Sequence, residues 1–556
     1  MNNWQKVNLN LIAKAIGEMV FEETLPVSQD KDLFSFTTSK GVQYTFTATK
    51  SVWGWIKVNP ESIKRNGEAS IEASQLFIDT QEFTRMSDIT LAQFIEEMRS
   101  TLFADLKLLN GPSASEFTTL SYLESQQSLN GHPKILMNKG RIGWNPQDWN
   151  KYAPENKEKF PLRLIALKSP LVKGVVPLWN HYEALTTSNH LNEIEKIIDL
   201  KQFILMPVHP WQWDNIIRYQ FQKEIHEGDL IDLGETKKLF SPQVSLRTLN
   251  AEDSKYEIKL PLSILNTSCI RGIPAKTIEL GSEISNAMIE LISNDTFLDG
   301  KVDVLKESAG ITYIPKDLAQ IENAPYRFHE YLGAIWRESA ESKVREDESI
   351  ILTANLLYVD SQGKSSVSSY IEKSGLTPKE WIKEYTKAVI IPLLHLQQQH
   401  GIGLVSHGQN IMMVLENYRP KKLVLKDFQG DFRFSDQAPK STIDLFGDVF
   451  NKITKLKPEH LIHDLYTAHF VTLLRYVGMN LSIDNTLCEK EFYRTISEEV
   501  ASYELNYSGS VSLLKQYFEK ILINAVRFKI GYGDSSERPL PLLGNQIANP
   551  LSRLNL

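Results

Sequence analysis

Cysteine is scarce in this chain of 556 residues, which contains only Cys269 and Cys488. Two cysteines cannot form a disulfide framework or a four-cysteine zinc site, so we expect a protein of a reducing compartment. Long apolar runs are also missing, since no stretch approaches the ~20 apolar residues of a membrane span. The first residues lack a basic segment followed by an apolar one, so no signal peptide is expected. These absences predict a cytoplasmic protein that does not associate with a membrane.

An excess of positive charge is absent too. The chain has 61 basic and 68 acidic side chains, a net charge of −7, which argues against a general nucleic-acid partner. It does not exclude a local cationic site for a small anion. Hydrophobic residues make up 42% and charged residues 23%, as in ordinary globular proteins, and the length predicts two or three domains.

The residue patterns divide the chain into three regions. Residues 1–200 mix helical periodicity, at 4–24 and 88–109, with strand-like segments at 33–36 and 44–57. Residues 201–345 contain a buried strand at 203–208 and largely alternating segments at 244–249 and 255–260, which favour a hairpin of an antiparallel sheet. Residues 346–556 are mostly helical, with helices expected at 377–400 and 458–479. We predict an α+β fold with these three regions as its domains.

Two apolar runs, 411–415 and 423–425, enclose a polar turn and predict a β-hairpin in the third region. His407 and Asn410 stand at its entry and Asp427 at its exit. An imidazole, an amide and a carboxylate brought together suit Mg²⁺ and phosphate oxygens, and kinase-type nucleotide sites use a similar plan. The alternative is a core hairpin with a capping Asn and a solvated Asp.

A second set of polar residues follows the alternating segments of the middle region. Ser245 and Arg247 share one face of the first segment, and Lys259 joins them in one strand register. With Thr248, Thr267 and Arg271 they make a group of guanidinium, ammonium and hydroxyl donors that suits a triphosphate. The alternative is a half-exposed sheet with solvated charges.

Glycines and cations alternate in the loop at 131–143, which contains His132, Lys139 and Arg141. Such a backbone can approach an anion closely, although an ordinary surface turn has the same composition.

Arg475 lies in the helix predicted at 458–479. His460 and His463 in the same helix have no third ligand at a zinc-like spacing, which argues against zinc there.

Short segments spread over nearly the whole chain carry a family resemblance. They are 131–134 with 138–141, 207–213, 245–249, 258–274, 324–327 with 335–338, 407–410, 425–431 and 461–465. In this order they resemble the IucA/IucC family of siderophore synthetases, which work without a peptide-synthetase assembly line. Many members have a second His-Pro pair where this chain has Ile135 and Leu136. One branch of the family also lacks that pair, and the chain is most similar to that branch.

The resemblance implies a hand-like enzyme with an N-terminal thumb (1–200), antiparallel-β fingers (201–345) and a mainly helical palm (346–556) that contains the kinase-like hairpin. It implies ATP and Mg²⁺ as cofactors and a possible homodimer. The catalytic candidates are His407, Arg271 and Lys259. The ATP-binding candidates are Ser245, Arg247, Thr248, Lys259, Thr267, Arg271, His407 and Asn410; the metal candidates are Asp427, Asn410 and Gln429; and the substrate-binding candidates are His132, Lys139, Arg141 and Arg475.

The activity implied by the resemblance is ATP-dependent adenylation of a citrate-type carboxylate, followed by capture of the acyl-adenylate by an amine. For the branch in question the partners are a citryl mono-amide and the amine of N6-acetyl-N6-hydroxylysine, and the products include AMP and pyrophosphate. A different hydroxamate amine, as in schizokinen-like siderophores, is the nearest alternative. The hairpin considered by itself leaves two more alternatives, a kinase-like phosphotransferase and a non-catalytic nucleotide-binding scaffold.

Overall fold

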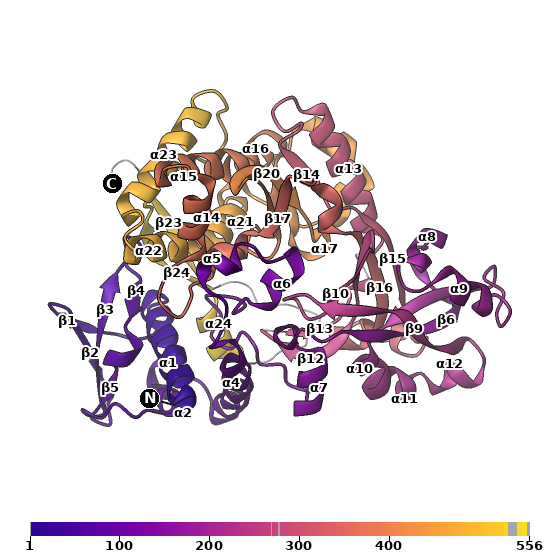
Figure 1. Ribbon diagram of the computed structural model, residues 1–556, viewed down its shortest axis with the longest axis horizontal. Helices are drawn as coiled ribbons and strands as arrows, with labels where there is room; N and C mark the ends of the chain where they lie inside the picture. The colour runs from indigo at the N-terminus through magenta and orange to yellow at the C-terminus, as the bar shows by residue number, and fades with distance from the viewer. Residues whose placement is uncertain (1, 268, 276–277, 532–541, 553–556) are drawn as a thin grey trace.

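The computed structural model describes residues 2–267, 269–275, 278–531 and 542–552, and it has three parts (Figure 1). An N-terminal part packs helices against a small sheet. A middle part is built on a long sheet, and a C-terminal part is mainly helical with a sheet of its own. Helices and strands are both abundant, so the predicted α+β class is confirmed.

Helix α1 (Asn3–Phe21) organises the N-terminal part and begins at a capping box made by Asn2 and Gln5. Its apolar stripe, which includes Ile12 and Ile16, is buried against the small sheet and against α4, as the sequence periodicity predicts. The sheet has the order β1-β2-β3-β4, and β5 also pairs with β3. The elements are β1 (Ser28–Asp30), β2 (Leu33–Thr37), β3 (Gln43–Lys50), β4 (Ile56–Val58), β5 (Lys64–Arg65), α2 (Ala73–Asp79), α3 (Gln81–Thr84) and α4 (Asp88–Leu108).

The middle part is an eight-stranded sheet in the order β7-β15-β16-β11-β10-β9-β6-β8, and every neighbouring pair is antiparallel. Its strands are β6 (Phe160–Lys168), β7 (Lys173–Val175), β8 (Phe203–Val208), β9 (Leu230–Pro242), β10 (Thr248–Ala251), β11 (Tyr256–Lys259), β15 (Glu307–Tyr313) and β16 (Leu332–Glu338). The hairpin of β12 (Leu262–Asn266) and β13 (Cys269–Arg271) follows β11. The helices before and around this sheet are α5 (Ala114–Phe117), α6 (Tyr122–Gln127), α7 (Pro146–Tyr152), α8 (Trp179–Glu183), α9 (Ser188–Ile194), α10 (Pro210–Gln212), α11 (Arg218–Gln220) and α12 (Gln222–His226).

The C-terminal part contains a four-stranded sheet in the order β14 (Val302–Val304), β20 (Arg419–Leu425), β19 (Ile411–Glu416) and β17 (Glu348–Leu352). Strands β19 and β20 are the hairpin predicted from the sequence, with Met412 opposite Val424. Asn417 and Tyr418 join them and have positive φ angles of 50° and 64°, the backbone that a tight hairpin turn requires. This hairpin brings His407 and Asp427 to the same end of the sheet.

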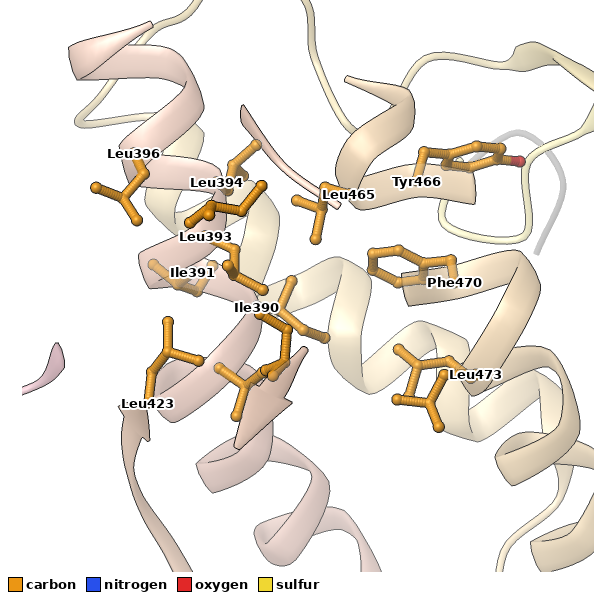
Figure 2. Close-up of a cluster of buried hydrophobic side chains, with 14 of the residues drawn as sticks. Ile390, Ile391, Leu393, Leu394, Leu396, Leu423, Leu465, Tyr466, Phe470 and Leu473 are labelled. Carbon is orange, nitrogen blue, oxygen red and sulfur yellow. The ribbon is translucent and has the colours of Figure 1, made fainter. Parts of the chain in front are cut away.

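The helix predicted at 377–400 is present as α15 (Pro378–Tyr385), a π-helical turn η10 (Thr386–Ile390) and α16 (Ile391–His400), and it ends at Gly401. Figure 2 shows its Ile390 and Leu394 in a buried cluster with Leu465, Phe470 and Leu423. The helix predicted at 458–479 is α20 (Pro458–Leu461), α21 (His463–Leu465), the π-helical η11 (Tyr466–Leu474) and α22 (Arg475–Ile483). The cluster therefore joins both long helices to β20.

The remaining elements complete this part and return to the N-terminal one. They are α13 (Leu280–Asn294), η9 (Thr353–Leu357), α14 (Ser366–Ser374), β18 (Ile402–Leu404), α17 (Phe428–Asp431), β21 (Phe432–Ser435), α18 (Lys440–Phe446), α19 (Asp448–Lys452), β22 (Lys455–Leu456), α23 (Glu489–Glu504), β23 (Tyr517–Leu522), α24 (Asn524–Ile530) and β24 (Leu542–Ala548). Phe528 of α24 packs against Phe77 and Phe94 of the N-terminal part. No helix among the described residues is long and apolar enough to cross a bilayer.

The predicted domain boundaries are wrong in detail. Strands β6 and β7 lie before residue 200 but belong to the eight-stranded sheet, while α13 and β14 lie before residue 345 but pack in the C-terminal part. The chain crosses between the parts more than once, and local residue patterns do not reveal which distant strand pairs with which. The strand predicted at 244–249 begins only at Thr248. Ser245 and Arg247 therefore lie in the turn before it, where Leu246 has a left-handed backbone with φ of 68°.

Candidate active site

Two cations of the long sheet meet a carboxylate of the C-terminal part. Lys259, the last residue of β11, places Nζ 2.7 Å from Asp427 Oδ1. Arg337 of the neighbouring strand β16 places Nη1 2.8 Å from the same oxygen. The middle and C-terminal parts are thus joined by charged side chains at this point.

The strand register explains why these cations share one face. Glu257 and Lys259 are two residues apart on β11 and point to the same side, and Arg337 lies directly opposite Glu257 on β16. Arg337 donates to Glu257 from Nε and Nη2, at 3.2 and 2.5 Å, and both side chains are buried. Lys259 lies opposite Thr248 on β10, so the strand register that would put Lys259 on one face with Ser245 and Arg247 is not the one observed.

Asp427 itself has an unusual backbone conformation and an unusually low side-chain pKa. It lies between β20 and α17 with φ of 64° and ψ of 59°, a left-handed conformation that is strained for most residues other than glycine. Burial acts to raise the pKa of Asp427, but the charges of Arg337, Lys259 and Lys426 outweigh it and hold this pKa well below the usual range. The Asp427 carboxylate is therefore ionised near neutral pH.

The segment from Ser406 to Asn410 leads into β19, whose first residue, Ile411, pairs with Leu425 just before Asp427. Gly408 accepts a backbone hydrogen bond from Ala354, and a Cβ on Gly408 would lie 2.9 Å from the Ala354 Cα, so only glycine fits there. Burial lowers the pKa of His407, while Asp431 and Asp427 act in the opposite direction. A neutral imidazole thus faces the acidic side chains near neutral pH.

The metal candidate Asn410 contacts an acid that the sequence analysis did not single out. The Asn410 side chain donates to Asp431 Oδ2 at 2.8 Å and to the Val405 carbonyl at 3.3 Å, so the acid beside it is Asp431. Asp427 lies close enough to affect His407 electrostatically. The side chain of Gln429 is outside the part of the chain that the structure describes. The carboxylates of Asp427 and Asp431 with the Asn410 amide supply oxygen donors of the kind that Mg²⁺ prefers.

Arg247 and Arg271 lie together beside the β12–β13 turn. Arg247 donates to the Gly272 carbonyl, and Arg271 donates to the Thr267 hydroxyl and, at 2.9 Å, to the Asn266 carbonyl. Burial and then the charge of Arg271 lower the pKa of Arg247, and Asp427 acts against them. The Arg247 guanidinium is thus close enough to both Arg271 and Asp427 to interact with their charges.

The hydroxyl candidates are arranged around these cations. Ser245 Oγ accepts from the Thr248 backbone N–H at 3.2 Å, and the Thr248 side chain is buried on the strand opposite Lys259. Thr267 has φ of 62°, the left-handed backbone of the tight turn that presents Arg271. Of the ATP-binding candidates, the sheet and its hairpin thus supply Ser245, Arg247, Thr248, Lys259, Thr267 and Arg271, and the C-terminal part supplies His407 and Asn410.

The first two of the four substrate-binding candidates, His132 and Lys139, lie in different surroundings. The His132 ring lies 6.4 Å from the His407 ring, nearly perpendicular to it, and burial keeps the pKa of His132 well below its usual value. Lys139 pairs with Asp105 at 2.7 Å. His132 is therefore brought to the candidate site, and Lys139 lies beside the cavity described below.

Arg141 and Arg475, the other two substrate-binding candidates, are each paired with a buried carboxylate, and their role in substrate binding stays a prediction. Arg141 makes a two-point ion pair with Glu155, at 2.5 and 3.0 Å, and both side chains are buried. Arg475 is fully buried and bonds to both oxygens of Glu18 at 2.9 Å. A buried guanidinium is stable only when a carboxylate compensates its charge, and here each already has one inside the fold.

A cavity of about 480 Å³ lies between the N-terminal part and the loop that carries His132. We call it the thumb cavity. Its walls combine apolar side chains, among them Leu11, Trp55 and Leu357, with the charged Lys14 and Lys139. Lys14 holds the loop by donating to the carbonyls of His132 and Ile135, at 3.1 and 2.7 Å. Gly131 and Ala354 also line the cavity, and Ala354 bonds to Gly408, so the cavity adjoins the His407 segment.

Sequence reasoning gave no role to two residues that the structure places in the site, Arg337 and Asp431. Arg337 bridges Glu257 and Asp427, and Asp431 accepts from Asn410. Both lie in segments that carry the family resemblance, at 335–338 and 425–431, so the signal was present. Only the pairing of β11 with β16 shows that Arg337 reaches Asp427.

Comparison with known proteins gives this arrangement a context. Residues 121–358 match the model of the IucA/IucC family, and residues 379–529 match a model described as ferric iron reductase FhuF-like transporter. The chain is 34% identical to an aerobactin synthase of Vibrio mimicus, with 99% of this chain and 97% of the relative covered. The chain belongs to the IucA/IucC family. The predicted family resemblance is confirmed.

Other relatives agree with this membership. The chain is 30% identical to the rhizobactin siderophore biosynthesis protein RhbF of Rhizobium meliloti, over 99% of this chain and 96% of the relative. The structure of aerobactin synthetase IucC from Klebsiella pneumoniae superposes with a TM-score of 0.86 at 29% identity, covering 99% of this chain and 98% of that one. As an IucA/IucC protein, the chain has the mixed fold of its family and belongs among siderophore-forming synthetases.

Proposed function

We propose that this protein is an ATP-dependent synthetase that adenylates the free carboxylate of a citryl mono-amide and joins it to the amine of N6-acetyl-N6-hydroxylysine, giving aerobactin, AMP and pyrophosphate. The observation that carries the proposal is the meeting of the sheet cations Lys259 and Arg337 with Asp427, beside His407. The full-length similarity to an aerobactin synthase supports the choice of substrates.

The charge balance of the reaction explains the need for these cations. ATP carries about four negative charges and the carboxylate adds one, so their approach costs several kcal/mol without compensation. In the proposed complex Lys259, Arg247 and Arg271 contact phosphate oxygens and stabilise the charge that builds up at the α-phosphorus. The carboxylate oxygen forms the new bond to phosphorus, and pyrophosphate leaves. Arg337, tied to Glu257, keeps Asp427 in place.

Asp427 and Asp431, with Asn410, would hold Mg²⁺ on the phosphates, and their oxygen donors fit that ion. When bound, the ion supplies positive charge that polarises phosphate oxygens. The strained backbone of Asp427 aims its carboxylate between the sheet cations and the His407 segment.

The second half of the reaction needs a base, and we assign this role to His407. Burial favours the neutral imidazole, which can accept the proton that the amine loses as its nitrogen attacks the acyl carbon and AMP leaves. His132 lies against His407 and is also neutral, so it adds no competing charge.

The thumb cavity is the place that we propose for the amine substrate. Its apolar walls suit the methylene chain of N6-acetyl-N6-hydroxylysine, and its polar groups suit the hydroxamate and carboxylate ends. The loop at 130–139 is shared by the cavity and by His132, so an amine bound there lies near the acyl group.

The central test is a reaction of purified protein with ATP, Mg²⁺, the citryl mono-amide and a panel of hydroxamate amines, followed by mass spectrometry and nucleotide analysis. We expect aerobactin, AMP and pyrophosphate. ADP in place of AMP would identify a phosphotransferase, and ATP binding without any turnover would identify a scaffold. A higher rate with another amine supports the second candidate, a different hydroxamate siderophore, which the similarity to the rhizobactin protein favours.

The role of the cavity is tested separately from the chemistry. Asn10 is exposed on α1 and lines the cavity, so Asn10→Trp narrows it without disturbing the core. We expect a raised KM for the amine and an unchanged rate of ATP–pyrophosphate exchange with the citryl substrate. Asn3→Trp on the same helix, outside the cavity lining, is the matched control. An unchanged KM for the amine in Asn10→Trp would remove the cavity from the proposal.

The homodimer implied by the family resemblance stays a prediction. Mass measurement of the purified protein in solution checks it, with a mass near twice 63.5 kDa expected.

A further inference from the structure

Three potential metal ligands converge in the C-terminal part, in residues that the proposed reaction does not use. Asp295 follows the last turn of α13, and His395 and His400 belong to α16. Asp295 Oδ2 lies 3.2 Å from His395 Nε2 and 2.6 Å from His400 Nε2. Among the described residues, this is the place where three such ligand atoms lie within 4.8 Å of one another.

The surroundings hold each ligand in a defined orientation. Asp295 Oδ1 accepts from the backbone N–H groups of Phe297 and Leu298, at 2.7 and 3.2 Å, which leaves Oδ2 directed at the imidazoles. The His395 ring is stacked on Phe297 with 4.3 Å between centroids, and its Nδ1 lies 3.0 Å from the Tyr503 hydroxyl. When Nδ1–H donates to Tyr503, the Nε2 lone pair points toward the cluster. Such a partner on the far nitrogen is what metal-binding histidines have.

The spacing and exposure suit a transition metal. Ligand atoms around tetrahedral Zn²⁺, with bonds of about 2.0–2.1 Å, are separated by roughly 3.3 Å, so small side-chain movements would admit the ion. The His395 side chain is 3% exposed, and those of Asp295 and His400 are 16% and 18% exposed. The site is thus anchored in the core yet open at one edge, where water can complete the coordination.

The charges nearby do not prevent binding. One carboxylate and two imidazoles bound through their nitrogen lone pairs would give the ligand set a single negative charge, and Lys301 is the nearby cation that acts on His395. The Lys301 ammonium lies over the Phe297 ring, 4.1 Å from its centroid, on a side chain separate from the three ligands.

We propose that Asp295, His395 and His400 bind one zinc ion. Two imidazoles and one carboxylate are donors that zinc accepts, with a water in the fourth position. The ion would fasten the end of α13 to the end of α16 and, through Tyr503, to α23. Because α16 leads through Gly401 and β18 toward the His407 segment, the role of the ion is to brace the C-terminal part rather than to take part in the reaction.

The competing explanation is a hydrogen-bonded group in which both Nε2–H groups donate to Asp295. His400→Gln separates the two, because the Gln amide can still donate to Asp295 but is a poor zinc ligand. His400→Ala removes both interactions. His460→Ala, at an exposed histidine of the same part of the chain, is the control.

The experiment uses the full chain, stripped with EDTA and transferred to chelator-free buffer. Zinc chloride is titrated in a calorimeter, bound zinc is counted by mass spectrometry, and thermal unfolding is followed with and without zinc. We expect one zinc per chain and a raised Tm for the wild type and for His460→Ala. His400→Gln and His400→Ala should both lose roughly a hundredfold or more in affinity and show no zinc-dependent rise in Tm.

Two outcomes would overturn the proposal. One is the absence of stoichiometric zinc binding by the wild type. The other is zinc binding of equal affinity in the wild type and both His400 variants, which would place the ion elsewhere. In either case a lower Tm for His400→Ala than for His400→Gln, both without zinc, would assign the cluster to hydrogen bonding.

Discussion

Replacing Lys259 with methionine removes one positive charge from the proposed phosphate site and keeps a side chain of similar length. Lys259 is held by Asp427 at 2.7 Å, and its side chain is 15% exposed, so it is available to a ligand. A unit charge about 4 Å from a phosphate oxygen contributes roughly 4 kcal/mol at the effective dielectric constant of about 20 found near protein surfaces. Since about 1.4 kcal/mol is tenfold in rate, we expect kcat/KM of Lys259→Met to fall by about a thousandfold.

The same substitution should leave the protein folded. Asp427 retains its contact with Arg337 at 2.8 Å, so its buried carboxylate is not left without a cation. Lys168→Met is the matched control, because Lys168 also lies on the long sheet and pairs with Asp229, but its side chain is 44% exposed and belongs to another region. Exposed pairs of this kind contribute about 1 kcal/mol or less.

The assay is pyrophosphate release with ATP and the citryl mono-amide, together with thermal unfolding of all three proteins. We expect Lys168→Met to match the wild type in both measurements. If Lys259→Met stayed within about threefold of the wild-type kcat/KM, the sheet cations would not stabilise the transition state, and the proposed phosphate site would be wrong.

Two further predictions concern stability. Burial raises the pKa of Asp464 to about 7, against the opposing charge of Arg433. The unfolded carboxyl ionises near pH 4, so the native state binds more protons between about pH 4 and 7 and loses stability as the pH rises through that window. The Tm of Asp464→Asn relative to wild type should therefore increase from about pH 5 to about pH 8; a difference independent of pH contradicts this. Arg475→Met leaves the buried Glu18 with the more distant Lys134, at 3.8 Å, as its remaining cation. It should cost about 3 kcal/mol in urea unfolding, much of it recovered by adding Glu18→Gln; equal stability of the single and double variants contradicts the ion pair.

Local patterns were sufficient for many of the elements. The apolar stripe of residues 4–24 and the Thr377-Pro378 start before 378–400 are local signals of helices, and both helices are present. The runs around Asn417 and Tyr418 identify their hairpin in the same way. Family resemblance added the residues at the hairpin ends. In the structure Lys259 contacts Asp427, and the charge of Asp427 acts on Arg247 and His407.

Long-range pairing was beyond local patterns. Strand β6 belongs to the same sheet as β16, although more than 160 residues separate them, and α13 joins the C-terminal core. Arg337 acquires its role only because β16 pairs with β11. Local patterns likewise did not reveal that Arg475 pairs with Glu18, which lies on α1 at the other end of the chain.

The sequence by itself determined the local elements, the family and the chemical types available for a nucleotide site, because periodicity, turn residues and short ordered motifs are properties of neighbouring residues. Only the tertiary structure decided which charges face a ligand and which are neutralised inside the fold. It also decided that Asp295, His395 and His400 meet. These outcomes depend on contacts between distant segments, where burial makes an unpaired charge costly and so favours folds in which buried charges are paired.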